Sequence, residues 1–147
     1  MVSKRSLGVA ILVIAVTLFF VFPQGQGCLG GARCIAGQVT EVVDGETIKV
    51  EAHTVRLALA STPEMYDEAG QAAKNYLEKM CPVGSRVLVD EDDGQTVGRY
   101  GDIVALVRCN GLILNETMLG ENHATLPPDF CSVSEFSASN WAKENGC

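Results

Sequence analysis

The first part of the chain beyond residue 37 is dominated by short segments in which apolar and polar positions alternate. Such alternation, combined with many β-branched residues, is typical of strands that bury one face. Arg56 is the only charged side chain within the third of these segments. The dipeptide Asp44-Gly45 separates the first two and predicts a hairpin turn between them. The predicted strands are residues 38–43, 47–50 and 54–60.

The pattern changes at Thr62-Pro63, because proline cannot donate to a strand ladder and favours extended geometry in the residue before it. Residues 68–80 have the spacing of an amphipathic helix, which Pro82 terminates. The acidic segment 91–94 is expected to form a solvated turn. The remaining predicted elements are strands at 86–90 and 103–108 and short helices at 115–121 and within 134–143.

Three strands, a helix and two further strands form the element order of a small closed barrel of the OB type. We therefore predict a mainly β fold with helices, built as a five-stranded OB-type barrel with a crossing helix and short C-terminal helices. The length suits one domain. The expected divisions are residues 1–27 as a signal peptide or N-terminal membrane anchor, 28–36 as a linker, 37–126 as the barrel and 127–147 as a C-terminal tail.

The N-terminus carries the features of an export signal. Lys4 and Arg5 precede an apolar run, residues 7–22, whose only polar side chain is Thr17. The run lies between the length of a signal-peptide core, ~7–15 residues, and that of a spanning helix, about 20 residues. A basic flank sends the rest of the chain across the membrane. We expect a secreted or membrane-anchored domain, and the pattern leaves open a cleaved peptide, an uncleaved anchor or lipidation at Cys28.

Six cysteines in 147 residues favour an oxidising compartment, in which they form disulfides. The close spacing of a zinc cluster does not occur among them. Cys131 and Cys147 enclose a tail with few apolar residues, so we expect a bridge between them to stabilise the C-terminus by about 3 kcal/mol. The other candidate pairs are Cys81 with Cys109 and, as the remaining two, Cys28 with Cys34.

The charge of the chain limits the ligands that it can bind. The net charge is −7, but residues 1–27 hold two of the 11 basic residues and none of the 18 acidic ones. The 120 residues that follow therefore carry nine basic and 18 acidic side chains, a net charge of −9. This balance excludes a broad basic surface for nucleic acid. An anionic ligand must be held by a few placed cations or by a metal ion.

Three segments of the chain carry motifs in a fixed order: residues 42–50 (VVDGETIKV), 55–64 (VRLALASTPE) and 99–105 (RYGDIVA). They resemble the V-x-D-G-D-T, R-L-x-x-x-D-T-P-E and [K/R]-Y-G-R-x-hydrophobic-A segments of the staphylococcal nuclease (thermonuclease) family. Leu-Asn-Glu at 114–116 and His-Ala at 123–124 follow where the family has L/V-N-E and L-A. The resemblance runs from about residue 37 to residue 126 and implies an OB-type nuclease fold.

The resemblance implies Ca²⁺-assisted hydrolysis of phosphodiester bonds in nucleic acid. It makes Glu64 the general base and Arg56 the cation that faces the phosphate. Both roles suit the residue types, because a carboxylate can deprotonate water and a planar guanidinium can bind phosphate through two hydrogen bonds. The other positions that it implies are Glu46, Ser61 and the Thr62 backbone as Ca²⁺ ligands and Arg99 and Tyr100 as substrate-binding residues.

Three site positions depart from the family's pattern. Glu46 replaces an aspartate, which keeps the charge but lengthens the side chain. Ser61 replaces an aspartate and removes one carboxylate, which weakens the binding of a divalent cation. Asp102 replaces an arginine, a change of two charge units where a phosphate would lie. Loss of one such contact lowers the rate by ~10²–10³.

Asn115 admits two interpretations. Asn115-Glu116-Thr117 is an N-glycosylation sequon. The same asparagine matches the position that the family uses to brace its second helix. We expect the structural role.

We expect a monomeric, Ca²⁺-dependent nuclease outside the cytoplasm, acting on single-stranded DNA or RNA and attached to the membrane through its N-terminal segment if that segment is uncleaved. The alternative is a catalytically silent OB-fold binding module, since OB barrels bind oligonucleotides and oligosaccharides on one face. A disulfide-stapled surface protein is a third interpretation, which explains the cysteines but not Arg56 and Glu64. Position 102 is the feature that separates the first two.

Overall fold

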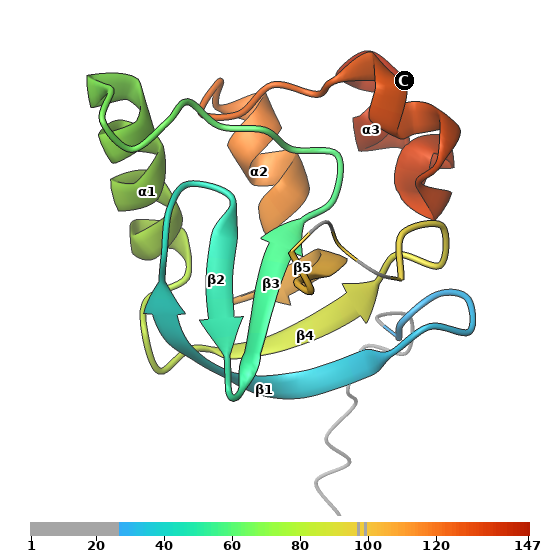
Figure 1. The fold of residues 1–147 in the computed structure, drawn as a ribbon, viewed down its shortest axis with the longest axis horizontal. Helices are drawn as coiled ribbons and strands as arrows, with labels where there is room; N and C mark the ends of the chain where they lie inside the picture. Colours follow the sequence, from blue (N-terminus) through green and yellow to red (C-terminus); the bar gives the residue numbers. More distant parts are fainter. Residues whose placement is uncertain (1–26, 97, 99) are drawn as a thin grey trace, which may run out of the picture.

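The computed structural model describes residues 27–96, 98 and 100–147. The predicted signal or anchor segment lies almost entirely outside these residues. Six strands form one sheet that closes on itself, with helices above it (Figure 1). The strands are β1 (Cys34–Val42), β2 (Thr47–Val50), β3 (His53–Leu57), β4 (Arg86–Glu91), β5 (Ile103–Cys109) and β6 (Leu112–Ile113).

Closure of the barrel depends on one parallel contact. The strand order is β3-β2-β1-β4-β5-β6, and β3 pairs in parallel with β5 to join the two ends. Every other pairing of these strands is antiparallel. The parallel register sets Arg56 opposite Val104. The predicted five-stranded barrel is therefore confirmed, and the short β6 extends β5 beyond it.

The barrel interior is filled by alternate side chains of all five strands, as expected of a small closed barrel. Its fully buried members include Ile48, Val55, Val89 and Val107. The helices are α1 (Glu68–Met80), α2 (Leu114–Gly120) and α3 (Asn140–Glu144), with 3₁₀ turns η1 (Pro128–Ser132) and η2 (Glu135–Ala138). Helix α1 has the predicted bounds, and it lies beside α2 at one end of the barrel (Figure 1).

The third strand is shorter than predicted, and the first begins earlier. β3 ends at Leu57, because Leu59 has a φ of 58° and leaves the extended conformation that a strand requires. β1 begins at Cys34, where it pairs with Asp90 of β4. The segment 28–36, which the sequence suggests as a linker, is thus part of the folded domain: its last residues are in β1.

Three disulfides join the six cysteines in the predicted pairs: Cys28–Cys34, Cys81–Cys109 and Cys131–Cys147. Three disulfides in a small domain are typical of an oxidising, extracellular environment. The bond to Cys34 also occupies the sulfur that lipidation of Cys28 would need. Within the described ranges, which start at residue 27, no helix is long and apolar enough to cross a membrane.

The acidic segment is only in part the solvated turn that its composition predicts: Asp93 and Gly94 are exposed, whereas Glu91 and Asp92 are buried. Glu91 and Asp92 are 2% and 0% exposed. Asp92 Oδ1 accepts hydrogen bonds from the backbone N–H groups of Gly94 and Glu135, at 3.0 Å each. Asp92 Oδ1 is thus satisfied by one donor from its own turn and one from the C-terminal tail, so its burial does not leave it unpaired. The tail, fixed by its disulfide, is held against the β4–β5 connection by this contact.

Candidate functional site

The closure of the barrel brings Arg56 and Asp102 together. Arg56 is on β3, and Asp102 immediately precedes β5, so the parallel pairing aligns the two. Arg56 Nε donates to Asp102 Oδ2 at 2.7 Å. The two side chains are 27% and 8% exposed, which makes the ion pair largely shielded from water. The cation predicted to face a phosphate is therefore partly neutralised by the residue that departs from the family's pattern.

The turn before β5 fixes the Asp102 carboxylate. The backbone N–H of Tyr100 donates to Asp102 Oδ1 at 3.2 Å, and that of Gly98 donates to the Asp102 carbonyl at 3.1 Å. A Cβ on Gly98 would collide with the same carboxylate. Both Asp102 oxygens thus have donors, one from the turn and one from Arg56, so the carboxylate is held in place.

A pocket of about 460 Å³ opens beside this pair. The predicted residues Glu46, Arg56, Tyr100 and Asp102 all line it, although they come from three separate segments of the sequence. Tyr100 is 83% exposed, so its ring is available for contact with a ligand. Residues that the sequence did not single out also line it: Arg33, Asp44, Thr47, Ala52, His53, Thr54, Gly101 and Ile103.

Glu46 supplies the carboxylate among the predicted metal ligands. Its Oε2 accepts the backbone N–H of Thr62 at 2.5 Å, and its own N–H donates to Asp44 Oδ1 at 2.9 Å. Burial raises the pKa of Glu46 above its usual value, and the nearby Asp44 carboxylate acts in the same direction. The Thr62 hydrogen bond and Arg56 oppose this shift without cancelling it. A cation at this place would stabilise the charged form.

Glu64, the predicted general base, lies in a neighbouring cleft. This cleft measures about 70 Å³ and is lined by Asp44, Glu46, Thr62, Pro63, Glu64 and Met65. Asp44 and Glu46 also line the larger pocket, so they form the wall between the two. Glu64 is exposed to solvent and therefore has access to water. Arg56 and Glu64 lie on different sides of this acidic wall.

The predicted Ca²⁺ ligands are only partly brought together. Glu46 and Thr62 share the small cleft, but Ser61 lines neither pocket. The Ser61 backbone exchanges two hydrogen bonds of 2.8 Å with Thr125. In the described part of the chain, no three side chains of the His, Cys, Asp or Glu type converge closely enough to hold a metal ion. Among the described residues the predicted ligands thus share no single pocket, and Ca²⁺ binding stays a prediction.

The predicted site residues differ in how the structure treats them. Arg99 lies outside the described residues. Asn115, by contrast, is fully buried: it accepts the Val107 N–H at 3.0 Å and donates to the carbonyls of Ala58 and Ala105 at 2.8 and 3.0 Å. It ties α2 to the middle of β5 and to Ala58, directly after β3, which confirms the structural role and leaves no room for a glycan. Arg33 was missed because nothing in its local sequence places it beside residues 56 and 102.

Comparisons with known proteins give a relative but no family. No protein-family model matches the chain. Over 100 residues it is 35% identical to an uncharacterized protein of Bacillus anthracis. The alignment covers 61% of this chain and 46% of that relative, so the chain spans about half the relative's length. The similarity assigns no activity.

Proposed function

We propose that the chain is an extracytoplasmic, nuclease-like barrel that binds a phosphodiester of single-stranded nucleic acid in the 460 Å³ pocket and hydrolyses it. One observation carries the proposal. Residues of three motif segments, separated by as many as 59 positions in the chain, line one pocket with a cation and an exposed aromatic ring. These are the two side-chain types that bind the phosphate and the base of a single strand.

The proposal assigns one role to each of three residues: Arg56 and Tyr100 line the pocket, and Glu64 lies in the neighbouring cleft. Arg56 uses Nε for Asp102, and its two terminal nitrogens bind a phosphate oxygen. Tyr100 offers a stacking surface for a base. Glu64, exposed beside the acidic wall, accepts a proton from the attacking water. Positive charge on Arg56 then stabilises the negative charge that develops on the phosphate.

The Arg56–Asp102 pair makes this hydrolase slow. A carboxylate 2.7 Å from the guanidinium lowers the positive potential that a phosphate would meet. The family carries an arginine at position 102, so that two arginines act together there. In this chain Arg56 has an anion, Asp102, in place of that second arginine. Ca²⁺ assistance, which the resemblance implies, is part of the proposal.

A second candidate is a catalytically silent OB-type binding module outside the cytoplasm. The observation that favours it is the same ion pair, together with the predicted Ca²⁺ ligands that share no single pocket. Binding to the exposed face of Tyr100 and to the terminal nitrogens of Arg56 needs neither a general base nor a metal ion. The two candidates therefore share a ligand and differ only in turnover.

The deciding experiment uses the full chain, oxidised and purified in a mild non-ionic detergent. Single-stranded DNA and RNA oligonucleotides are incubated with it in Ca²⁺ and in EDTA, and products are resolved on a denaturing gel. The hydrolase proposal expects cleavage that Glu64→Gln abolishes, because glutamine keeps the shape but cannot take a proton from water. Arg56→Lys serves as the test of the forked contact and should also be severe. Binding without cleavage in every condition supports the silent module.

A further inference from the structure

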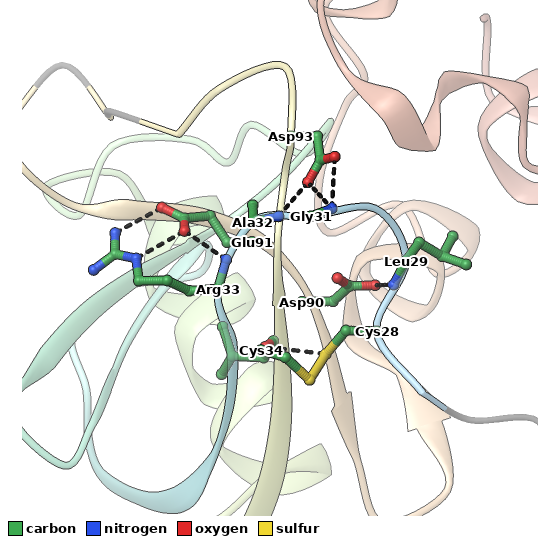
Figure 2. Close-up of a disulfide and its surroundings, with 10 residues drawn as sticks. Cys28, Leu29, Gly31, Ala32, Arg33, Cys34, Asp90, Glu91 and Asp93 are labelled. Carbon is green, nitrogen blue, oxygen red and sulfur yellow. Dashed lines mark hydrogen bonds and ion pairs between the residues drawn. A yellow bond between two sulfur atoms is a disulfide. The ribbon is translucent and has the colours of Figure 1, made fainter.

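The seven residues from Cys28 to Cys34, closed by their disulfide, form a ring that is fastened to the end of β4 (Figure 2). The fastening consists of backbone N–H groups that donate to carboxylates. Gly31 and Ala32 donate to Asp93 at 2.7–3.0 Å. The other two contacts are Leu29 N–H to Asp90 Oδ2 at 2.9 Å and Arg33 N–H to Glu91 Oε2 at 3.0 Å. The ring is therefore fixed by its covalent closure and by four separate donors.

Arg33 is the one cationic residue of this ring, and its side chain is also fixed. Its Nε and Nη2 donate to the two oxygens of Glu91 at 2.7 and 2.6 Å (Figure 2). Glu91 is 3% exposed and Arg33 is 52% exposed, so the pair is anchored on the barrel side and open on the arginine side. The hydrogen bond from Arg33 lowers the pKa of Glu91, which keeps the anchor charged. The third guanidinium nitrogen, Nη1, has no protein hydrogen-bond partner among residues 27–96, 98 and 100–147.

The same side chain lines the 460 Å³ pocket together with Arg56 and Tyr100. The pocket is thus lined by two arginines, each oriented by a carboxylate: Arg33 keeps Nη1 for a ligand, and Arg56 keeps its two terminal nitrogens. The ion pair compensates the charge of the buried Glu91 carboxylate, which is a structural reason for the Nε and Nη2 contacts of Arg33. It gives no reason for Arg33 to line the pocket, or for its Nη1 to lack a protein partner among the described residues. An anionic ligand gives a physical reason for both.

We propose that Arg33 is a second phosphate-binding residue of the pocket and that the Cys28–Cys34 ring positions it. The ligand class is a single-stranded polynucleotide, whose successive phosphates meet Arg56 and Arg33 while a base stacks on Tyr100. This inference rests on the proposed function and adds a binding residue from outside the three motif segments. It adds to the pocket, from the N-terminal ring, a second guanidinium that is oriented by a carboxylate and keeps Nη1 for a ligand.

The test measures binding, so that it does not depend on turnover. The full chain in detergent is titrated against fluorescein-labelled single-stranded DNA and RNA oligonucleotides in EDTA, with fluorescence anisotropy as the readout, at several salt concentrations. We expect Arg33→Ala to weaken binding about tenfold, the range for loss of a charge-assisted hydrogen bond. The slope of log affinity against log salt should become shallower by about 0.7, since one phosphate contact is lost. A merely structural arginine would not change that slope.

Arg86→Ala is the matched control. Arg86 is an exposed arginine, like Arg33. It lies on β4, at the opposite end of the strand from Glu91, and does not line this pocket. The Arg86→Ala substitution removes the same charge as Arg33→Ala, and we expect its affinity for the oligonucleotides to be within twofold of that of the parent. Arg33→Lys keeps the charge and loses the fork, so it guards against misfolding of the alanine variant. It should retain most of the salt slope with lower affinity.

Each outcome decides one of the two proposals. If the parent binds and Arg33→Ala and Arg33→Lys match Arg86→Ala in affinity and slope, the role of Arg33 is overturned while the proposed function stands. If the parent binds neither DNA nor RNA, the proposed function fails, and the variants are then titrated with inorganic pyrophosphate. Pyrophosphate binding that depends on Arg33 and not on Arg86 keeps the anion site; no binding overturns it.

Discussion

The carboxylate of Asp102 lies 2.7 Å from Nε of Arg56, and the register of the barrel is what brings them together. An anion at position 102 was expected from sequence to repel a phosphate. The structure adds that it also occupies one edge of the neighbouring guanidinium and holds that group still. The same contact that lowers the positive potential of the pocket therefore orients its main cation, and the activity of the site depends on which effect is larger.

The Cys131–Cys147 disulfide of the C-terminal tail is expected to contribute more to the free energy of unfolding than the Cys28–Cys34 disulfide of the N-terminal ring. The loop between Cys131 and Cys147 has a sequence separation of 16, against six for Cys28 and Cys34. By the loop-entropy estimate, replacing both cysteines with serine costs about 3 kcal/mol in the first case and about 2 kcal/mol in the second. Urea denaturation of the two double variants measures the difference. Equal losses, or a larger loss for the ring, would show that native contacts rather than loop entropy govern these bridges.

Glu46 should make the domain less stable as the pH rises. Its folded pKa is raised above the usual 4.5, so between 4.5 and the raised value the folded state binds more protons than the unfolded state. The free energy of unfolding then falls as the pH increases through this window, and the full penalty is present at neutral pH. Glu46→Gln removes the penalty, so the variant should be more stable than the parent at pH 7, with the difference shrinking below pH 4.5.

Glu41→Gln is the control of opposite sign. Hydrogen bonding to Lys49 lowers the pKa of the exposed Glu41, so its contribution is stabilising at neutral pH and is lost in acid. Thermal unfolding from pH 3 to pH 8 separates the two behaviours. A Glu46→Gln variant that is less stable than the parent at pH 7, with no pH dependence, contradicts the assignment.

Asn115→Ala should be strongly destabilising. The change leaves the Val107 N–H and the Ala58 and Ala105 carbonyls without their side-chain partner in a fully buried place. Unsatisfied buried groups of this kind cost about 1–3 kcal/mol each, and we expect a total of about 3 kcal/mol because water can relieve part of it. Thr117→Ala is the matched variant: it also destroys the sequon but loses only a half-buried bond to the Ile113 carbonyl. A loss below about 1 kcal/mol for Asn115→Ala contradicts the bracing role.

The barrel could be predicted because its signals are local. The bounds of α1 follow from helical spacing and a proline two residues beyond its end, and the first hairpin follows from Asp44-Gly45. The end of β3 is different. The alternation of side chains predicts that the strand continues through Leu59, whereas tertiary contacts hold Leu59 at a positive φ. One such contact is the hydrogen bond from Asn115 Nδ2 to the Ala58 carbonyl, which comes from 57 residues away.

The candidate site was predictable where motifs carry it and not elsewhere. Arg56, Glu46 and Tyr100 were found by segment order, and they do line one pocket. Burial of Glu91 and the place of Arg33 escaped prediction, because the two residues bind each other across 58 positions. A run of acidic residues is predicted to be exposed to solvent when the groups that donate hydrogen bonds to its carboxylates are distant in the sequence. Only the closed ring and the tail reveal that these carboxylates are structural acceptors.

Asp102→Arg separates the two candidate functions. It removes the acceptor of Arg56 Nε and of the Tyr100 N–H and puts a second cation where the family carries one. In a slow hydrolase, restoring such a contact raises the rate by ~10²–10³ if the rest of the site is in place. Asp102→Asn is the matched control, since it removes the negative charge while keeping a side-chain oxygen for the Tyr100 N–H. It should give a smaller gain, because it relieves repulsion without adding a cation.

The measurement is the initial rate of cleavage of single-stranded DNA and RNA by the full chain in Ca²⁺, with folding of each variant checked by circular dichroism. The expected order of rates is Asp102→Arg above Asp102→Asn above the parent, and Glu64→Gln introduced into the Asp102→Arg variant should return the rate to background. If correctly folded Asp102→Arg is no faster than the parent on either substrate, the slowness does not come from position 102. The placement of Glu46 and Ser61, which share no pocket, is then the stronger cause, and the binding module becomes the better account of a barrel that keeps Arg56 paired.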